Sequence, residues 1–191
     1  MTGDAFVPGP PALRLSSSST DTPVGRLTLV AGDAGLARVL WPGEPSPAGV
    51  APGSHPVLAA AERQIAEYFA GARAAFDVPL ALGGTAFQRS AWVELQSVPF
   101  ATTRTYGDQA RRLGRPNGAR AVGAANARNP LPIVLPCHRL VGAGGALTGF
   151  AGGLEVKRAL LEHEARVQAG AAAASAGSAR TRTSPAPRPR T

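Results

Sequence analysis

Hydrophobic positions follow two different spacings in the first third of the chain. Residues 26–31 and 36–41 are short stretches of β type separated by a Gly-Asp-Ala-Gly turn, so they predict an antiparallel hairpin. From His55 onward the apolar residues recur at the helical spacing of about 3.6 residues, and Gly71 is a typical helix stop. The apolar face of this predicted helix consists of Val57, Leu58, Ala61, Ile65, Tyr68 and Phe69.

These elements belong to a predicted first domain. Residues 1–21 are rich in Ser and Pro, so we expect a flexible lead-in and an ordered chain from Thr22. A short strand is expected over residues 76–80, at a sheet edge because Pro79 has no N–H to donate. The sequence therefore predicts an α/β (α+β) N-terminal domain with a small antiparallel sheet over residues 22–83.

The second half of the chain has mostly helical patterns. Thr105 and Asp108 have the Thr-x-x-Asp spacing of a helix start, and Gly114 is expected to end that helix. A tight turn leads to a second short helix over residues 118–126, which is built mostly of Gly and Ala. Two short helices joined in this way are typical of a helix-turn-helix, although the signal is weak by itself. An apolar stripe precedes them, formed by Phe87, Ala91, Trp92 and Leu95.

Charge is distributed unevenly along the chain. The net charge is +8, and residues 85–167 carry ten Arg and one Lys against five acidic residues. Basic residues concentrated in this way favour a polyanionic partner such as nucleic acid, because they replace its counterions. Residues 168–191 carry four Arg and no acidic residue, and their low complexity predicts a disordered basic tail. This tail either adds nonspecific DNA affinity or is an extension without a function.

Composition excludes several classes of protein. No stretch approaches the roughly 20 apolar residues of a membrane span, and the N-terminus lacks the basic start and apolar middle of a signal peptide. We therefore expect a cytoplasmic protein with no membrane partner. The chain has one cysteine, Cys137, which excludes an internal disulfide and a multi-cysteine zinc site. We expect no metal and no other cofactor.

The lone cysteine lies at the end of an apolar run, between Pro136 and His138. A free cysteine is most often a small buried hydrophobic residue. A neutral thiol becomes a good nucleophile only with a base or a positive neighbourhood, and His138, Arg139 and the pair at 163–164 are candidates to provide it. Adjacent side chains on an extended segment point to opposite faces, so contact between His138 and the thiol would need a turn or a bridging water.

These residues resemble the O6-alkylguanine-DNA alkyltransferases, also called methylated-DNA–protein-cysteine methyltransferases. The Pro-Cys-His-Arg core at 136–139 is flanked by Arg-Ala-Val-Gly at 120–123, Asn-Pro at 129–130 and Gly-Gly-Leu at 152–154. The stretches TPVGRLTLV, EYFAG and FDVPL extend the resemblance into the first domain. The resemblance implies a mostly helical C-terminal domain with a winged helix-turn-helix, which we assign to residues 84–167.

The resemblance also implies a role for individual residues. Cys137 would accept an alkyl group from O6 of guanine, with His138 as its base through a water molecule and Glu164 holding the imidazole. Asn129 would fix the turn around this network. Tyr106 would donate a hydrogen bond to the leaving guanine. Each protein molecule would act once, because nothing in the sequence is suited to cleaving a thioether.

The implied partner is double-stranded DNA that contains O6-alkylguanine, bound by a monomer. Arg120 would enter the duplex from the minor groove and fill the space left by a flipped nucleotide, offsetting the cost of flipping. The other expected DNA-binding residues are Ala119, Gly123, Ala124, Asn126 and Arg139. The substrate pocket is expected to be lined by Tyr106, Phe150, Ala151 and Lys157. Phe150-Ala151 replace the Tyr-Ser of many relatives, which removes two hydroxyls from this pocket.

Two other functions are consistent with a Cys-His pair on a basic chain. A cysteine hydrolase would turn over and release product steadily. A DNA-binding module would recognise alkylated bases without repairing them, and some relatives with the cysteine replaced do so. The presence of Cys137 argues against the second alternative.

Overall fold

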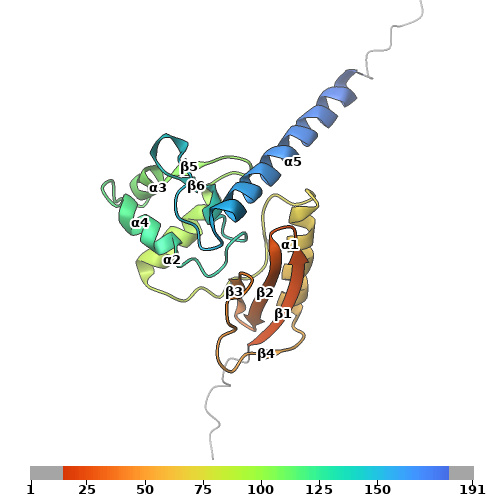
Figure 1. Cartoon of the computed structure of the whole chain (residues 1–191), viewed down its shortest axis with the longest axis vertical. Helices are drawn as coiled ribbons and strands as arrows, with labels where there is room; N and C mark the ends of the chain where they lie inside the picture. Colours follow the sequence, from red (N-terminus) through yellow and green to blue (C-terminus); the bar gives the residue numbers. More distant parts are fainter. Residues whose placement is uncertain (1–14, 181–191) are drawn as a thin grey trace, which may run out of the picture.

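The computed structural model describes residues 15–180, with side chains placed as far as residue 174 (Figure 1). Its N-terminal half is a four-stranded sheet in the order β3-β2-β1-β4. The pairs β1–β2 and β2–β3 are antiparallel, which confirms the predicted hairpin, whereas β4 pairs with β1 in parallel and makes the sheet mixed. The strands are β1 (Ser16–Thr22), β2 (Gly25–Gly32), β3 (Gly35–Leu40) and β4 (Ala51–Pro52).

Two predictions for this half are wrong. Strand β1 begins six residues before Thr22, because its backbone pairs with β2 along its whole length, from Ser16 opposite Ala31 onward. A Ser-Thr run has no hydrophobic pattern to reveal such pairing. Residues 1–14 of the predicted lead-in lie outside the described part of the chain. Residues 76–80 form no strand, and Leu80 makes only an isolated bridge to Leu36.

Helix α1 (Pro56–Phe69) follows the predicted pattern and packs against the sheet. The side chain of His55 caps its N-terminus by accepting a hydrogen bond from the backbone N of Val57. Pro56 suits the first turn because that turn needs no N–H. Gly71 follows the helix with a φ of +76°, a conformation that favours glycine.

Up to Arg180 the second half contains four α-helices, and the predicted helix-turn-helix is present as α3 and α4. Thr105 caps α3 by accepting from the backbone N of Asp108. Trp92 Nε1 donates to the carbonyl of Ala125, which ties α2 to α4. These helices are α2 (Ala86–Glu94), α3 (Tyr106–Arg112), α4 (Ala119–Asn126) and α5 (Leu154–Arg180). The shorter elements are η1 (Leu95–Ser97), β5 (Arg104–Thr105), η2 (Cys137–Arg139), β6 (Leu140–Val141) and η3 (Ala143–Gly145), with β5 and β6 paired in parallel.

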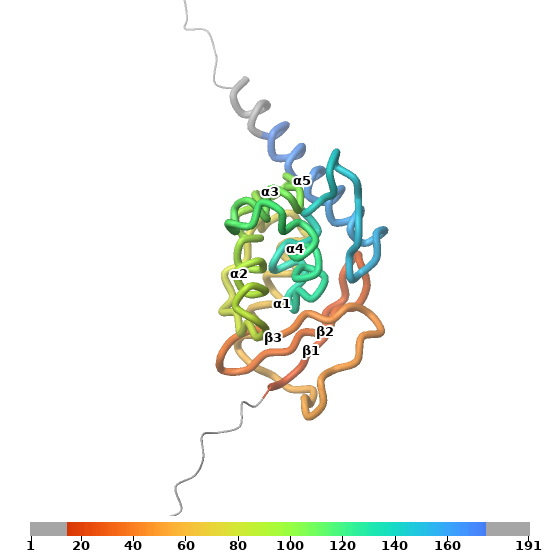
Figure 2. Tube along the Cα trace, turned by 90° about the vertical axis from the view of Figure 1, so that its left-hand side faces the viewer, coloured from red at the N-terminus to blue at the C-terminus, as the bar shows by residue number. Residues whose placement is uncertain are grey.

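The two halves share one hydrophobic core. Leu27 and Leu29 of the sheet lie in the same cluster as Leu131 and Leu135, which precede Cys137. Figure 2 shows the strands β1, β2 and β3 at one end of the molecule and α3 at the other. The segment that carries the cysteine is therefore fixed from both sides. Within residues 15–180, no helix is long and apolar enough to cross a membrane.

The prediction of a disordered tail is wrong for residues 168–180. Helix α5 continues to Arg180, and its C-terminal part extends away from both halves (Figure 1). Residues 171–174 are all Ala, the residue with the highest helix propensity, so the low complexity of this segment is compatible with a helix. Residues 181–191 of the predicted tail lie outside the described part of the chain.

Candidate active site

Cys137 begins η2, directly after the buried segment that leads out of α4. Its side chain is buried, with 7% of the residue exposed. Asn129 organises this segment by donating from Nδ2 to the carbonyl of Leu135 at 2.8 Å and accepting from the backbone N of Leu131 at 3.0 Å. Ile133, between these two contacts, has a φ of +72°, which is strained for a β-branched residue. The approach to the cysteine is thus a tightly bent segment rather than an extended strand.

His138 and Glu164 form a buried pair. His138 Nε2 and Glu164 Oε1 lie 2.9 Å apart, and neither residue is exposed to solvent. His138 Nδ1 is buried and has no hydrogen-bond partner among the described residues. Burial lowers the pKa of His138, against the opposing effect of Glu164. The imidazole is therefore held by one nitrogen and stays neutral, with its other nitrogen available as a base.

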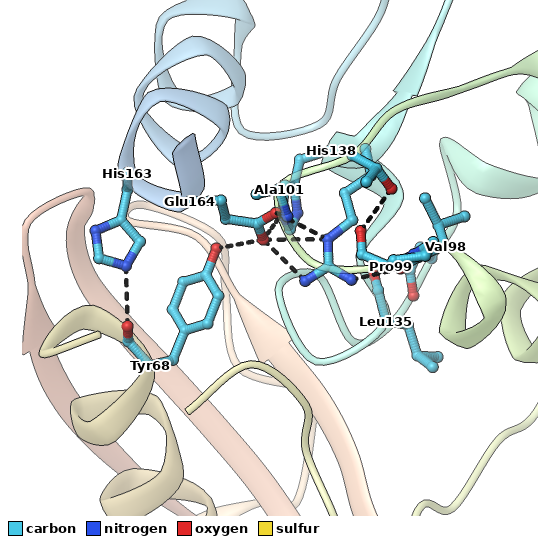
Figure 3. A network of polar contacts seen from close by, with 11 residues as sticks. Tyr68, Val98, Pro99, Ala101, Leu135, His138, His163 and Glu164 are labelled. Atoms are coloured by element: carbon cyan, nitrogen blue, oxygen red, sulfur yellow. Dashed lines mark hydrogen bonds and ion pairs between the residues drawn. The ribbon is translucent and has the colours of Figure 1, made fainter. Parts of the chain in front are cut away.

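Glu164 is the centre of a larger network (Figure 3). Its Oε2 accepts from the backbone N of Ala101 at 2.8 Å, and Arg139 contacts both carboxylate oxygens through Nε. Burial by itself would raise the pKa of Glu164, but the hydrogen bonds from His138 and Arg139 outweigh it and lower the pKa to about 2. Tyr68 of α1 also donates to Oε1. Glu164 is therefore ionised at neutral pH and shared among several donors.

Two residues expected to contact DNA are in the interior instead. Arg139 is only 5% exposed, and its Nη1 donates to the carbonyl of Val98 at 2.7 Å in addition to its contacts with Glu164. Asn126 lies on the inner face of α4, where its Nδ2 donates to Gln109 Oε1 at 2.7 Å. The sequence shows that these residues are polar but not which face they occupy, so assigning them to DNA was wrong.

The thiol is uncharged in this environment. Burial raises the pKa of Cys137 to about 11, although a hydrogen bond from Asn129 and the charge of Lys157 act in the opposite direction. Lys157 is itself buried, and its Nζ donates to the carbonyl of Thr148 at 2.8 Å. Reaction at neutral pH would therefore require a base that takes the thiol proton.

A cavity of about 930 Å³ lies on the α3–α4 face of the molecule. Arg120 lines it from α4 and is exposed to solvent. A much smaller cavity beside it is lined by Cys137, and Tyr106 and Phe150 line both cavities. The thiol thus lies behind a wall of the larger cavity. The other residues expected on this face include Ala119, Gly123 and Ala151, which line the large cavity, and Ala124, which is exposed on α4 outside that lining.

The wall of the small cavity is supported by the N-terminal half. Trp41 meets the ring of Phe150 edge-on, with 5.5 Å between the ring centroids. Tyr106 OH lies 3.4 Å from the carbonyl of Gly149, and burial raises the pKa of this tyrosine, which keeps its hydroxyl protonated. The sequence patterns did not identify Trp41, Tyr68 or Ala101 as part of the site. Tyr68 was placed only on the apolar face of α1.

Comparison with known proteins gives consistent matches over most of the chain. The family described as 6-O-methylguanine DNA methyltransferase matches in two parts, its ribonuclease-like domain over residues 15–82 and its DNA binding domain over residues 86–166. The methylated-DNA–protein-cysteine methyltransferase of Mycolicibacterium paratuberculosis is 45% identical over 78% of this chain and 91% of that protein. Its counterpart in Methanosarcina acetivorans is 53% identical over 54% of this chain and 67% of that protein. The crystal structure of Mycobacterium tuberculosis OGT in complex with DNA superposes with a TM-score of 0.74 and 42% identity, covering 80% of this chain and 94% of that one.

Proposed function

Because the chain belongs to the 6-O-methylguanine DNA methyltransferase family, we propose that it repairs DNA by transferring an alkyl group from O6 of guanine to its own Cys137. The observation that carries this proposal is the buried Cys137 beside the His138–Glu164 pair, behind a wall of the cavity on the α3–α4 face. The substrate is double-stranded DNA that contains O6-alkylguanine, and the protein acts on it as a monomer.

The reaction is an in-line displacement. His138 takes the thiol proton on its free Nδ1 through a water molecule, and Glu164 stabilises the imidazolium that forms. The thiolate of Cys137 attacks the alkyl carbon, so that an S–C bond forms while the C–O6 bond breaks. The bonding pair of the broken bond leaves with O6, and Tyr106 donates a hydrogen bond to the guanine anion. This anion takes up a proton from solvent, and His138 releases the thiol proton to solvent. The product is a thioether, which no group near Cys137 is suited to hydrolyse, so each molecule acts once.

Access to a base in a duplex requires that the nucleotide leave the stack. Helix α4 is suited to a close approach to DNA because Ala119, Gly123 and Ala124 present little side-chain volume. Arg120 carries the long cationic side chain of this helix and lines the cavity. We propose that this side chain fills the space that the extruded nucleotide leaves in the duplex. The basic second half of the chain supplies the charge that attracts the phosphate backbone.

Intact-mass measurement tests the proposal directly. Protein mixed with DNA containing O6-methylguanine should gain about 14 Da, the mass of a methyl group in place of the thiol proton. The increment should lie on the peptide that contains Cys137, and repair should stop at one base per protein molecule. Cys137→Ser should abolish transfer and keep DNA binding, because a serine hydroxyl is scarcely ionised at neutral pH. Continued turnover would instead support a hydrolase, and transfer by Cys137→Ser would exclude Cys137 as the acceptor.

A further inference from the structure

Tyr68 connects the N-terminal half of the protein to the proposed catalytic network. It lies in the last turn of α1, and its OH donates to Glu164 Oε1 at 2.9 Å (Figure 3). Both residues are completely buried, and they are 96 positions apart in the sequence. A hydrogen bond from a neutral donor to a buried carboxylate is stronger than one between neutral groups. The contact is therefore a direct polar link from α1 to the carboxylate that holds His138.

The side chain of Tyr68 has little freedom to move. Its ring meets the rings of Phe69 and Phe100 edge-on, with centroid distances of 5.1 and 6.1 Å. His163, the neighbour of Glu164 on α5, contacts the backbone carbonyl of Tyr68 through Nε2 at 2.9 Å. Adjacent residues of α5 thus bind the main chain and the hydroxyl of the same tyrosine. Tyr68 is therefore held to α5 through both its hydroxyl and its backbone carbonyl.

Three residues donate to the same carboxylate oxygen, Arg139 among them through both Nη2 and Nε. Tyr68 OH, His138 Nε2 and Arg139 Nη2 all lie 2.9 Å from Glu164 Oε1. A carboxylate oxygen has two lone pairs, so the three bonds cannot all reach full strength. Each donor withdraws negative charge from the carboxylate, and the donor from α1 does so without adding a charge of its own. The hydroxyl of Tyr68 therefore weakens the hold of Glu164 on His138.

We propose that Tyr68 is a positioning residue for the alkyl transfer, one that limits how strongly the Glu164 carboxylate binds His138. The inference rests on the proposed function, because it assigns His138 the role of base. A base must be neutral before it takes the thiol proton. A carboxylate that bound His138 more strongly would favour the protonated imidazolium in the resting protein, and that form cannot accept the proton. The N-terminal half thus contributes to the reaction as well as to the core.

The charges around His138 determine the direction of the expected effect. The charged groups that act on it are Glu164 and Lys157 from α5 and Arg139 from η2. Tyr68 stays neutral, because burial and then the charge of Glu164 raise the pKa of its phenol. Removing the hydroxyl leaves more charge on Oε1, so the pKa of His138 should rise.

The test is the pH dependence of single-turnover methyl transfer from duplex DNA at saturating protein. In Tyr68→Phe the acid limb of the profile should move to higher pH by about half a unit, which lowers the rate on that limb roughly threefold. The rate on the neutral plateau should stay close to that of the unaltered protein. A profile that is lowered equally at every pH, or one that does not move, would overturn the proposal and leave Tyr68 with a structural role only.

A matched control is available one turn earlier on α1. Gln64 is also buried and is hydrogen-bonded to Asp77, and Glu164 is not among its hydrogen-bond partners in the described part of the chain. Gln64→Leu removes a buried polar contact from the same helix, so it should lower stability without moving the acid limb. If it moves the limb as far as Tyr68→Phe does, the effect comes from general loosening of α1 and the proposal fails.

A second replacement keeps the ring and its hydroxyl and should move the acid limb in the opposite direction. Site-specific 3-fluorotyrosine at position 68 has a more acidic hydroxyl, which donates more strongly to the carboxylate. The acid limb should then move to lower pH, and a shift to higher pH would contradict the proposal. Failure of the unaltered protein to gain mass on Cys137 would overturn the proposed function itself. These outcomes are distinct, because the Tyr68 experiment compares proteins that all transfer the methyl group.

Discussion

Replacing Glu164, the carboxylate at the centre of the network, should remove a large part of the protein's free energy of unfolding. Glu164→Gln keeps the size of the side chain and removes its charge. Arg139 would remain, buried and without its counterion. The new NH2 group would face other donors in either orientation, namely Tyr68, His138 and Arg139 at the place of Oε1 or the backbone N–H of Ala101 and Arg139 Nε at the place of Oε2. Removing one partner of a buried ion pair costs about 3–5 kcal/mol. Since domains are stable by about 5–15 kcal/mol, this is a large fraction of the total.

The lowered pKa of Glu164 gives a second estimate of how much this residue contributes to the free energy of unfolding. It falls from an ordinary value of 4.5 to about 2, and one pKa unit corresponds to about 1.4 kcal/mol, so ionised Glu164 stabilises the fold by ~3 kcal/mol. A carboxyl whose pKa is lowered on folding contributes this stability only while it is ionised. The contribution is therefore complete above pH 4.5 and is lost as the pH falls through about 2. The two routes agree in order of magnitude.

Urea denaturation of both proteins over a range of pH is the assay. At pH 7 the free energy of unfolding of Glu164→Gln should be lower by about 3 kcal/mol or more. The difference between the two proteins should shrink as the pH falls below 4.5, because the native carboxyl is then being protonated. A difference below about 1 kcal/mol at pH 7, the usual size of a surface ion pair, would refute the reasoning. So would a difference that does not change with pH.

Two further substitutions test the cavity on the α3–α4 face and the packing of Trp41, which supports its wall. Arg120→Ala should slow transfer from duplex DNA by roughly tenfold or more while leaving reaction with free O6-methylguanine base nearly unchanged, because flipping costs a few kcal/mol only in a duplex; equal losses on both substrates would exclude its role in flipping. Gly152→Ala would place a Cβ 2.8 Å from Cε2 of buried Trp41, so it should cost about 1–3 kcal/mol of stability in thermal unfolding. Gly83→Ala, where the new Cβ meets nothing within 4 Å, is its control, and equal melting temperatures would show that the Trp41 contact is not tight.

Local patterns in the sequence were sufficient for most of the fold. The hairpin, α1 and α3 follow from turn residues, from helical spacing and from the cap at Thr105, and each signal lies within a few residues of the element that it specifies. Strand β1 was missed because its order comes from pairing with β2 and not from its own Ser-Thr sequence. The extension of α5 was missed because an Ala-rich segment matches both a low-complexity tail and a helix.

The residues of the site were predictable only in part, because the sequence does not show which distant residues pack together. The resemblance supplied Cys137, His138 and Glu164, and the structure brings the last two within 2.9 Å. Arg139 has the charge of a DNA contact, yet it lies inside because Glu164 is there to pair with it. Neither residue type nor spacing shows that two groups 25 positions apart share a buried pocket. The contact of Tyr68 was missed for the same reason, since its ring fits the apolar pattern of the α1 face that packs into the core, and that pattern does not show which partner its hydroxyl meets.

The same burial that stabilises the network also controls when the thiol reacts. The pKa of Cys137 is raised to about 11 by burial, and burial lowers that of His138, so both partners of the proposed proton transfer are uncharged at rest. The thiolate rather than the thiol is the species that oxidants and electrophiles attack. In a protein that uses its cysteine once, every thiol lost to a side reaction inactivates a whole molecule. Keeping the thiol neutral until a base, held by Glu164, takes its proton in the presence of substrate therefore preserves the reagent as well as directing the reaction.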